Sequence, residues 1–110
     1  MKYYKNDTAK TTVMSSSTAR KIKQMLIKSL DGGTGRTAKP KKTLGGGKTA
    51  TAQTGWIKNG RKIDNSWFCG FFEANGKTYV ASILIEDIKT QKTSCTKIFR
   101  EIADEIYSLY

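Results

Sequence analysis

The stretch Gly47-Lys48-Thr49 has the residue types that end a phosphate-binding loop of nucleotide triphosphatases. Such a loop needs a first glycine five positions before Gly47, where this chain has Lys42, and a helix that starts at the lysine. Instead, Thr49, Thr51 and Thr54 alternate with small residues, a pattern that favours an extended chain. The spacing therefore argues against a nucleotide site and predicts a strand.

Other common site chemistries are excluded by composition. The chain has no histidine, and its two cysteines, Cys69 and Cys95, stand 26 positions apart, so the usual zinc sites and any histidine-based triad are ruled out. We interpret both cysteines as buried or idle thiols in preference to a disulfide. The sequence predicts no metal site and no cofactor.

A serine followed three residues later by a lysine is a nucleophile pattern, and it occurs in Ser94-Cys95-Thr96-Lys97. Because this stretch opens an amphipathic segment after the predicted strands, Ser94 is better explained as a helix N-cap than as a nucleophile.

Charge is unevenly distributed. The net charge is +11, with 20 basic and 9 acidic residues in all; residues 1–62 hold 15 basic and 2 acidic side chains, and residues 63–110 hold 5 and 7. A basic half is compatible with binding to an anionic polymer, although no motif of a known nucleic-acid reader is present and we do not expect specific nucleic-acid binding. No apolar run approaches the length of a membrane span, and the N-terminus lacks the core of a signal peptide, so the chain as given is expected to be soluble.

The candidate residues described above must be positioned by secondary-structure elements, and the sequence predicts two helices and a set of strands. Ser15 to Ser17 offer an N-cap, and apolar residues at helical spacing then predict a helix over about 15–30, ended by two glycines. Residues 31–47 are predicted to be a loop, strands are predicted within about 48–86, and a second amphipathic helix within about 95–109.

Two Asn-Gly pairs, Asn59-Gly60 and Asn75-Gly76, lie between apolar runs and predict tight hairpins. The expected fold is therefore α+β: a three-stranded antiparallel sheet with a short hairpin extension, and an N-terminal and a C-terminal helix packed on it, in a single domain over 1–110. Because Tyr79 to Ile85 is nearly all apolar, this last strand is predicted to be buried on both faces.

These elements carry a recognisable set of motifs: Gly33-Thr34-Gly35-x-x-Ala38, then Gly47 to Gln53, then Trp67-Phe68-x-Gly70-Phe71 and Tyr79-x-Ala81. In order and spacing they resemble the C-terminal part of the transpeptidase domain of class B penicillin-binding proteins, the bacterial enzymes that cross-link peptidoglycan. The resemblance runs from about Val13 to Tyr110 and implies a partial penicillin-binding transpeptidase fold.

The resemblance also assigns roles to the predicted strand that starts at Lys48. It implies that this strand lines the active site, where a D-alanyl-D-alanine stem pairs with its edge and Lys48 supplies positive charge near the substrate carboxylate and the nucleophile. Thr49 would bind the carboxylate, and the backbone N–H of Thr51 would be one of two oxyanion-hole donors. Ala50, which stands where the family usually has glycine, and Gln53 complete the expected substrate-binding set.

The family's serine nucleophile and its Ser-x-Asn box lie N-terminal to everything that this chain resembles. We therefore expect a fragment of a serine D,D-transpeptidase that carries the substrate wall and is not catalytic alone. The parent would act at the extracytoplasmic face of a bacterial cytoplasmic membrane on peptidoglycan stem peptides and β-lactams. The expected partner of the fragment is the N-terminal remainder of that domain.

Without that remainder, apolar area is expected to be exposed at Phe68, Phe71, Phe72 and residues 83–85, which would favour a homodimer or strand exchange. Two other interpretations remain open. One is a stand-alone basic module that binds an anionic polymer such as nucleic acid, teichoic acid or lipid head groups, and the other is a structural subdomain without a ligand.

Overall fold

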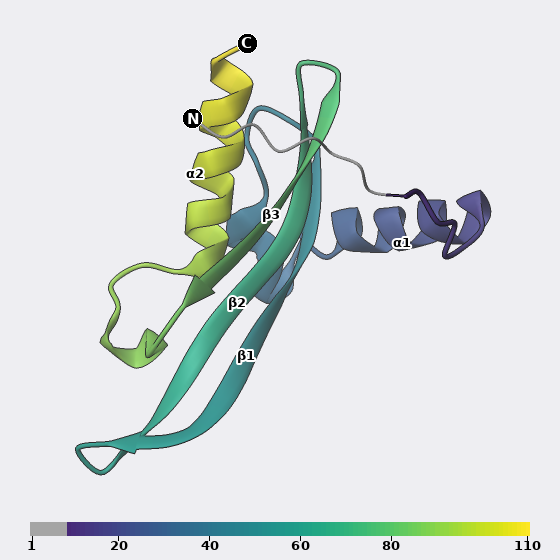
Figure 1. The fold of residues 1–110 in the computed structure, drawn as a ribbon. Coiled ribbons are helices and arrows are strands. Elements are labelled where there is room, and N and C mark those ends of the chain that lie inside the picture. The colour runs from purple at the N-terminus through teal and green to yellow at the C-terminus, as the bar shows by residue number, and fades with distance from the viewer. Residues whose placement is uncertain (1–8) are drawn as a thin grey trace.

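Three strands form one antiparallel sheet in the computed structural model, which describes residues 9–110. They are β1 (Gly45–Lys58), β2 (Arg61–Ala74) and β3 (Lys77–Ile85), in the spatial order β1-β2-β3. A helix lies on each side of the sheet, and the far end of the β1–β2 hairpin extends beyond both helices (Figure 1). The predicted α+β fold is confirmed, and the predicted hairpin extension is a direct continuation of β1 and β2.

The two turns of the sheet form as the Asn-Gly pairs predict. Asn59 and Gly60 have φ of 53° and 73°, and Asn75 and Gly76 have φ of 51° and 70°. Two successive residues at positive φ make the turn whose twist matches the strands that it joins, and asparagine and glycine tolerate that conformation best. The Asn75-Gly76 turn sets the register of β2 with β3, and the Asn59-Gly60 turn sets the register of β1 with β2 as far as the shift between Ile57 and Gln53.

The face of the sheet covered by α2 (Cys95–Ser108) holds the core, and we call it the α2 face. Ser94 caps this helix, as predicted: its Oγ accepts a hydrogen bond from Lys97 N. Phe68 and Phe72 of β2 are fully buried against Phe99 of α2, with ring centroids 4.6 Å and 5.9 Å from that of Phe99. Most of the apolar stabilisation therefore comes from this face.

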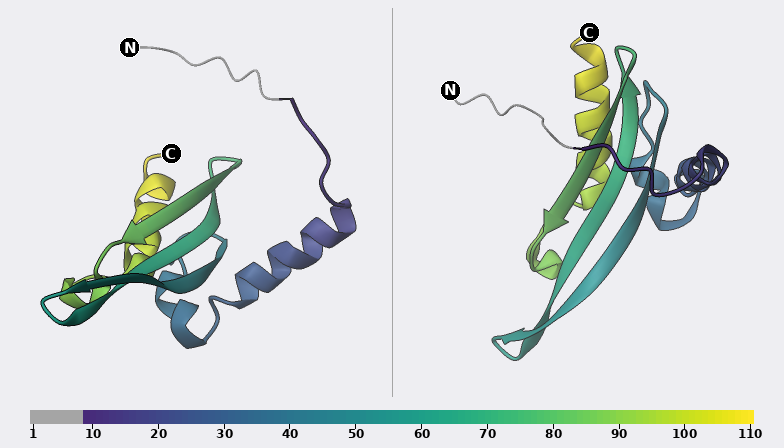
Figure 2. Two further views of the ribbon diagram at one scale, coloured as in Figure 1. Left: turned by 60° about the horizontal axis from the view of Figure 1, so that its bottom comes forward. Right: turned by 45° about the vertical axis from the view of Figure 1, so that its right-hand side comes forward.

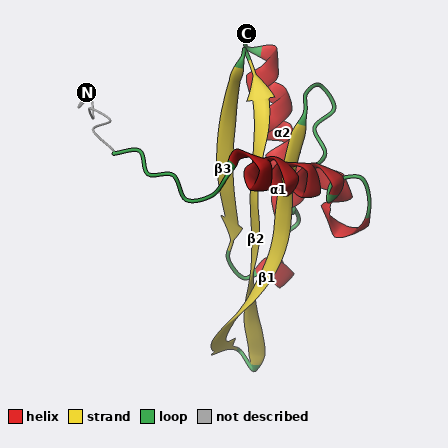
Figure 3. Cartoon of the chain, turned by 90° about the vertical axis from the view of Figure 1, so that its right-hand side faces the viewer, coloured by secondary structure: helices red, strands yellow, loops and turns green. Residues whose placement is uncertain are grey.

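The opposite face, the α1 face, is covered only in part by α1 (Ser16–Lys28), which runs across the strands (Figure 3). No residue of α1 is fully buried. The helix is held near one end of the sheet by an ion pair of 2.9 Å between Lys23 Nζ and Glu73 Oε1. Two further views show α1 and α2 on opposite sides of the strands (Figure 2).

The strand β1 begins at Gly45, three residues before the predicted Lys48. Gly45, Gly46 and Gly47 are buried where the helix and the loop meet the sheet. A Cβ added to Gly46 would lie 2.8 Å from the backbone nitrogen of Ile27, so only glycine lets α1 approach so closely. The segment predicted as a loop over 31–47 also contains a short 3-10 helix, η1 (Gly33–Ala38).

Two burial predictions are wrong. Strand β3 is not buried on both faces: its residues alternate between half-buried and exposed, and Val80 is 82% exposed. Phe68 and Phe72 were expected to be exposed, but α2 buries them completely. Of the other residues expected to be exposed, Leu84 is exposed, and Phe71, Ile83 and Ile85 are half-buried. Of the two free cysteines, Cys95 is buried and Cys69 is exposed.

Candidate functional site

The hydrogen bonds between β1 and β2 determine which backbone groups of β1 point toward β2 and which point to its free outer edge. Glu73 N donates to Leu44 O over 3.1 Å, and the register pairs Gly45 with Phe72, so Leu44 and Glu73 form a hydrogen-bonded pair. Such pairs alternate along an antiparallel ladder. The backbone groups that point inward to β2 are therefore those of Lys48, Ala50 and Ala52, and those that point outward are those of Gly47, Thr49, Thr51 and Gln53.

Two side-chain contacts agree with this alternation. The Ser29 hydroxyl donates a hydrogen bond to Gly47 O, and Lys48 Nζ donates to Thr49 O over 3.0 Å. Both acceptors are carbonyls of the outward-pointing set. The ammonium group of Lys48 therefore lies at the outer edge of β1, beside backbone N–H groups that have no partner strand in this sheet.

The side chains of the predicted site divide between the two faces. Lys48 and Ala50 oppose Cys69 and Trp67 on the α1 face, and Thr49 and Thr51 lie on the α2 face. Ala50 is exposed, so its methyl group has room. Gln53 is exposed, opposite Asp64, at the point where the register of β1 shifts.

A cavity rich in hydroxyl groups adjoins Thr49 and Thr51 on the α2 face. Thr49 Oγ1 lies 3.3 Å from Thr34 Oγ1, which η1 contributes. The cavity has a volume of about 340 Å³, and its hydroxyl groups come from Thr34, Thr49, Thr51, Ser66, Ser94 and Thr96. It offers hydrogen-bond donors and acceptors without a charge.

Sequence analysis missed the contributions of Thr34, Ser66 and Thr96 to this cavity. Thr34 belongs to a motif that the sequence does show, but no local pattern marks Ser66 or Thr96 as neighbours of the strand. Ser94 lies in the cavity, yet its hydroxyl is occupied by the helix cap and a contact of 3.1 Å with Thr96 Oγ1.

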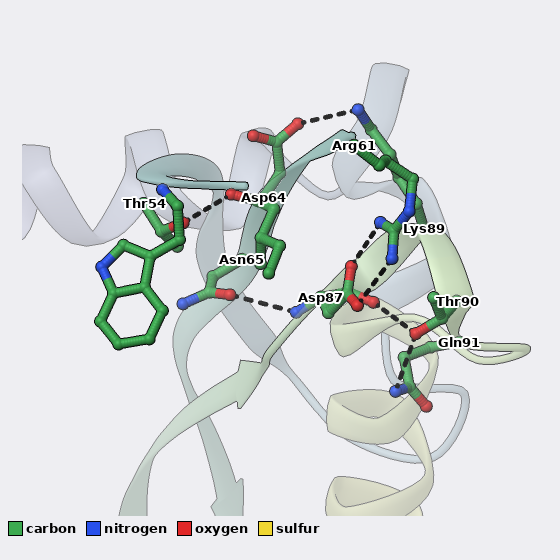
Figure 4. A network of polar contacts seen from close by, with 10 residues as sticks. Thr54, Arg61, Asp64, Asn65, Asp87, Lys89, Thr90 and Gln91 are labelled. Carbon is green, nitrogen blue, oxygen red and sulfur yellow. Dashed lines mark hydrogen bonds and ion pairs between the residues drawn. The ribbon is translucent and has the colours of Figure 1, made fainter. Parts of the chain in front are cut away.

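A polar network braces the far end of the β1–β2 hairpin (Figure 4). The guanidinium group of Arg61 donates to both carboxylate oxygens of Asp87, over 2.6 Å and 2.9 Å. This hydrogen bonding lowers the pKa of Asp87 below its ordinary value. Asn65 Oδ1 accepts a hydrogen bond from Asp87 N, and Lys89 pairs with Asp64 over 3.5 Å. The network ties β2 to the segment that follows β3.

Within residues 9–110 no group of three or more acidic, cysteine or histidine side chains is arranged to hold a metal ion. No helix in that range is long and apolar enough to cross a membrane.

Comparison with known proteins gives one result. A family model described as the penicillin binding protein transpeptidase domain matches residues 2–104. Neither the curated proteins nor the solved structures gave a significant match.

Proposed function

The chain belongs to the family of penicillin-binding protein transpeptidase domains, and on that premise we propose that β1 is the substrate wall of a peptidoglycan D,D-transpeptidase. The observation that carries this proposal is the outward direction of the Thr49 and Thr51 backbone groups beside the Lys48 ammonium. We further propose that the match corresponds to the C-terminal part of a class B enzyme, of which this chain is a segment.

In the proposed complex, the D-alanyl-D-alanine end of a stem peptide adds to the outer edge of β1 as a further strand. Its carboxylate accepts hydrogen bonds from Lys48 and from the hydroxyl of Thr49. The backbone N–H of Thr51 donates to the oxygen that becomes negative when the scissile carbonyl is attacked. One such donor typically contributes about 3–4 kcal/mol of transition-state stabilisation. A β-lactam would occupy the same edge.

We propose that the nucleophile is not among these residues. The sequence contains one Ser-x-x-Lys, and the hydroxyl of its serine, Ser94, caps α2 and contacts Thr96. On this proposal the chain alone binds the substrate end without turnover. The rest of a transpeptidase domain, acting at the extracytoplasmic face of a bacterial membrane, would supply the serine.

The test is an NMR titration of the chain with N-acetyl-D-alanyl-D-alanine, followed at the backbone amides. We expect the largest shifts at Thr49 and Thr51, and weaker binding in Lys48→Met and Thr49→Val because each loses a donor to the carboxylate. Lys62→Met, which removes an exposed lysine of β2, is the matched control. Equal binding of the L,L-dipeptide, or shifts spread over all lysines, would contradict the proposal.

The second candidate function is binding to an anionic polymer, and the exposed basic surface of α1 favours it. This helix carries Arg20, Lys21, Lys23 and Lys28 and has no acidic residue in its first turn. Binding to a polyanion would weaken steeply between low and physiological ionic strength. The dipeptide, a ligand with one charge, would show a much smaller salt dependence.

The open α1 face is where we propose that the rest of the transpeptidase domain packs, or a second copy of this chain in its absence. Val80 and Leu84 present exposed apolar surface on this face, which α1 covers only in part. A clean monomer in gel filtration at high concentration would contradict self-association.

A further inference from the structure

The free outer edge of β1 has a definite beginning. Residues 45–47 of the strand are buried, whereas residues 50–53 are exposed. The end of α1 covers the buried residues so closely that a Cβ added to Gly46 would lie 2.8 Å from Ile27 N. A strand that pairs with this edge therefore cannot continue past Gly47 unless α1 moves.

One side chain closes this end of the edge. Ser29 is the C-cap residue of α1, and its hydroxyl donates to Gly47 O and lies 2.8 Å from Leu26 O. A hydroxyl has one hydrogen, which the two carbonyls share. The backbone of Ser29 is fixed as well, because its carbonyl oxygen would lie 2.6 Å from a Cβ added to Gly35. The serine oxygen is thus held against the last buried carbonyl of the outer edge.

The hydrogen-bonding groups that remain on the edge are unequal. Gly47 O accepts from Ser29, and Thr49 O accepts from Lys48 Nζ over 3.0 Å, so both of these outward carbonyls already have a partner. The outward N–H groups of Thr49 and Thr51 have no partner strand in this sheet. Between Gly47 and Thr49 the backbone edge therefore offers N–H donors and no free carbonyl.

This inequality selects among the ends of a ligand. An extended peptide that continued beyond Thr49 toward Gly47 would bring an N–H to a place where every carbonyl is occupied. A donor that loses its water and finds no acceptor lowers affinity. An end group that contains only acceptors meets the N–H groups without that loss.

From these contacts, we propose that Ser29 is a specificity-determining residue of the β1 edge. By occupying Gly47 O, its hydroxyl ends the usable edge at Thr49 and excludes ligands that carry an N–H beyond the carbonyl bound there. Ser29 acts through Gly47 and does not touch the ligand, so its role is that of a positioning residue. This inference rests on the proposed function, because it uses the same strand edge.

Two neutral ligands isolate the effect of that N–H. The methyl ester and the N-methylamide of N-acetyl-D-alanyl-D-alanine have nearly the same shape, and they differ in an oxygen or an N–H beyond the terminal carbonyl. Binding to the full chain is followed at the amides of Thr49 and Thr51. We expect the ester to bind about fivefold more tightly, as for one donor without a partner. The charge of Lys48 does not favour either ligand, because both are neutral.

Variants of Ser29 test whether its hydroxyl causes the preference. Ser29→Ala frees Gly47 O to accept the N–H of the N-methylamide, so the preference for the ester should vanish or reverse. Ser29→Thr keeps the hydroxyl and should keep the preference.

Ser108→Ala is the matched control. The hydroxyl of Ser108 donates to Asp104 O over 2.9 Å in the last turn of α2, so the variant removes the same group from the same kind of place outside the β1 edge. The ratio of the two affinities should stay unchanged in this variant.

The ratio of the two affinities also separates the proposed role from a structural one. If Ser29 only holds α1 against the sheet, Ser29→Ala will weaken the ester, the N-methylamide and the free acid by the same factor. That result would overturn the proposal, and so would equal affinities of the unmodified chain for the ester and the N-methylamide.

The free acid distinguishes failure of this proposal from failure of the proposed function. Shifts at Thr49 and Thr51 with the acid, together with a ratio that Ser29→Ala leaves unchanged, overturn the role of Ser29 and leave the substrate wall in place. If the acid shifts neither amide, the proposed function fails, and the role of Ser29 is overturned with it.

Discussion

The molecule has a closed region and an open region on the same three strands. In the closed region, the α2 face and the β1–β2 ladder, Phe68 and Phe72 are fully buried against α2. In the open region, the α1 face and the outer edge of β1, Trp67 is 37% exposed and Val80 is 82% exposed. Neighbouring residues of one strand, such as Trp67 and Phe68, thus belong to different environments.

The difference separates stability from recognition. The closed region holds the strands with apolar packing that needs no partner. The open region presents Lys48, the outward amides of Thr49 and Thr51, and a cavity lined by Trp56 and Ile63, and it contributes little burial of its own. Substitutions in the open region are therefore expected to change binding with little effect on folding, and those in the closed region the reverse.

The largest expected effect compares adjacent residues of β2. Phe68→Ala should lower the free energy of unfolding by about 3–5 kcal/mol, because it empties a fully buried site between the sheet and Phe99. Trp67→Ala, on the open face, should cost less, about 2 kcal/mol, because this side chain is 37% exposed and loses only part of its burial. Urea denaturation measures both. Equal losses of unfolding free energy in the two variants would show that the α1 face is covered in solution, and would contradict the distinction between the closed and the open region.

A smaller effect is expected from proline substitutions at two neighbouring positions of β1, whose amides point in opposite directions. Ala52→Pro removes an amide that is bonded to β2, and we expect it to cost about 3 kcal/mol. Thr51→Pro removes an amide that points outward, and should cost about 1 kcal/mol, since proline is tolerated where the strand edge is free.

The two proline variants also differ in binding. Thr51→Pro should stay folded by circular dichroism and lose the dipeptide-induced shifts along β1, because the amide that meets the ligand is gone. If Thr51→Pro unfolds the chain as completely as Ala52→Pro, the assignment of inward and outward amides is wrong.

The smallest expected effect concerns the Arg61–Asp87 pair, which braces the open region against the segment after β3. Because the pKa of Asp87 is lowered from its ordinary 3.8 in the folded state, its contribution to stability is present above that value. It is lost as the pH falls through the folded pKa. Asp87→Asn keeps a residue that tolerates the positive φ of 49° at this position and removes the titration.

We therefore expect the stability of the unmodified chain to fall more between pH 5 and about pH 3 than that of Asp87→Asn, as measured by urea midpoints at each pH. At neutral pH the variant should be the less stable of the two. Parallel pH profiles would show that Asp87 contributes no pH-dependent stability.

Local features were predictable because they depend on neighbouring residues. The helix cap at Ser94 and the two Asn-Gly hairpins are confirmed, since a cap and a tight turn are made by a few consecutive residues. The family resemblance is confirmed at the level of the transpeptidase domain. The assignment to class B and the roles of Lys48, Thr49, Ala50, Thr51 and Gln53 remain predictions.

Burial was predicted less well because it depends on which element covers which face. The apolar run of β3 indicated burial on both faces, but α1 crosses the sheet on the β1 side and leaves Val80 exposed. The early start of β1 at Gly45 was missed for a related reason. Consecutive glycines predict a loop when only neighbouring residues are considered. Their place in a strand is explained only by the close approach of α1.

By itself, the sequence determined the order of the elements and the two turns, which set the register of the residues next to each turn. These follow from backbone conformations that each short segment prefers on its own. Only the tertiary structure decided that Thr34, Ser66 and Thr96 meet beside Thr51, and that Trp56 and Glu86 share a cavity. Such neighbours come from distant segments, and the packing of helices and strands brings them together after the local preferences have been met.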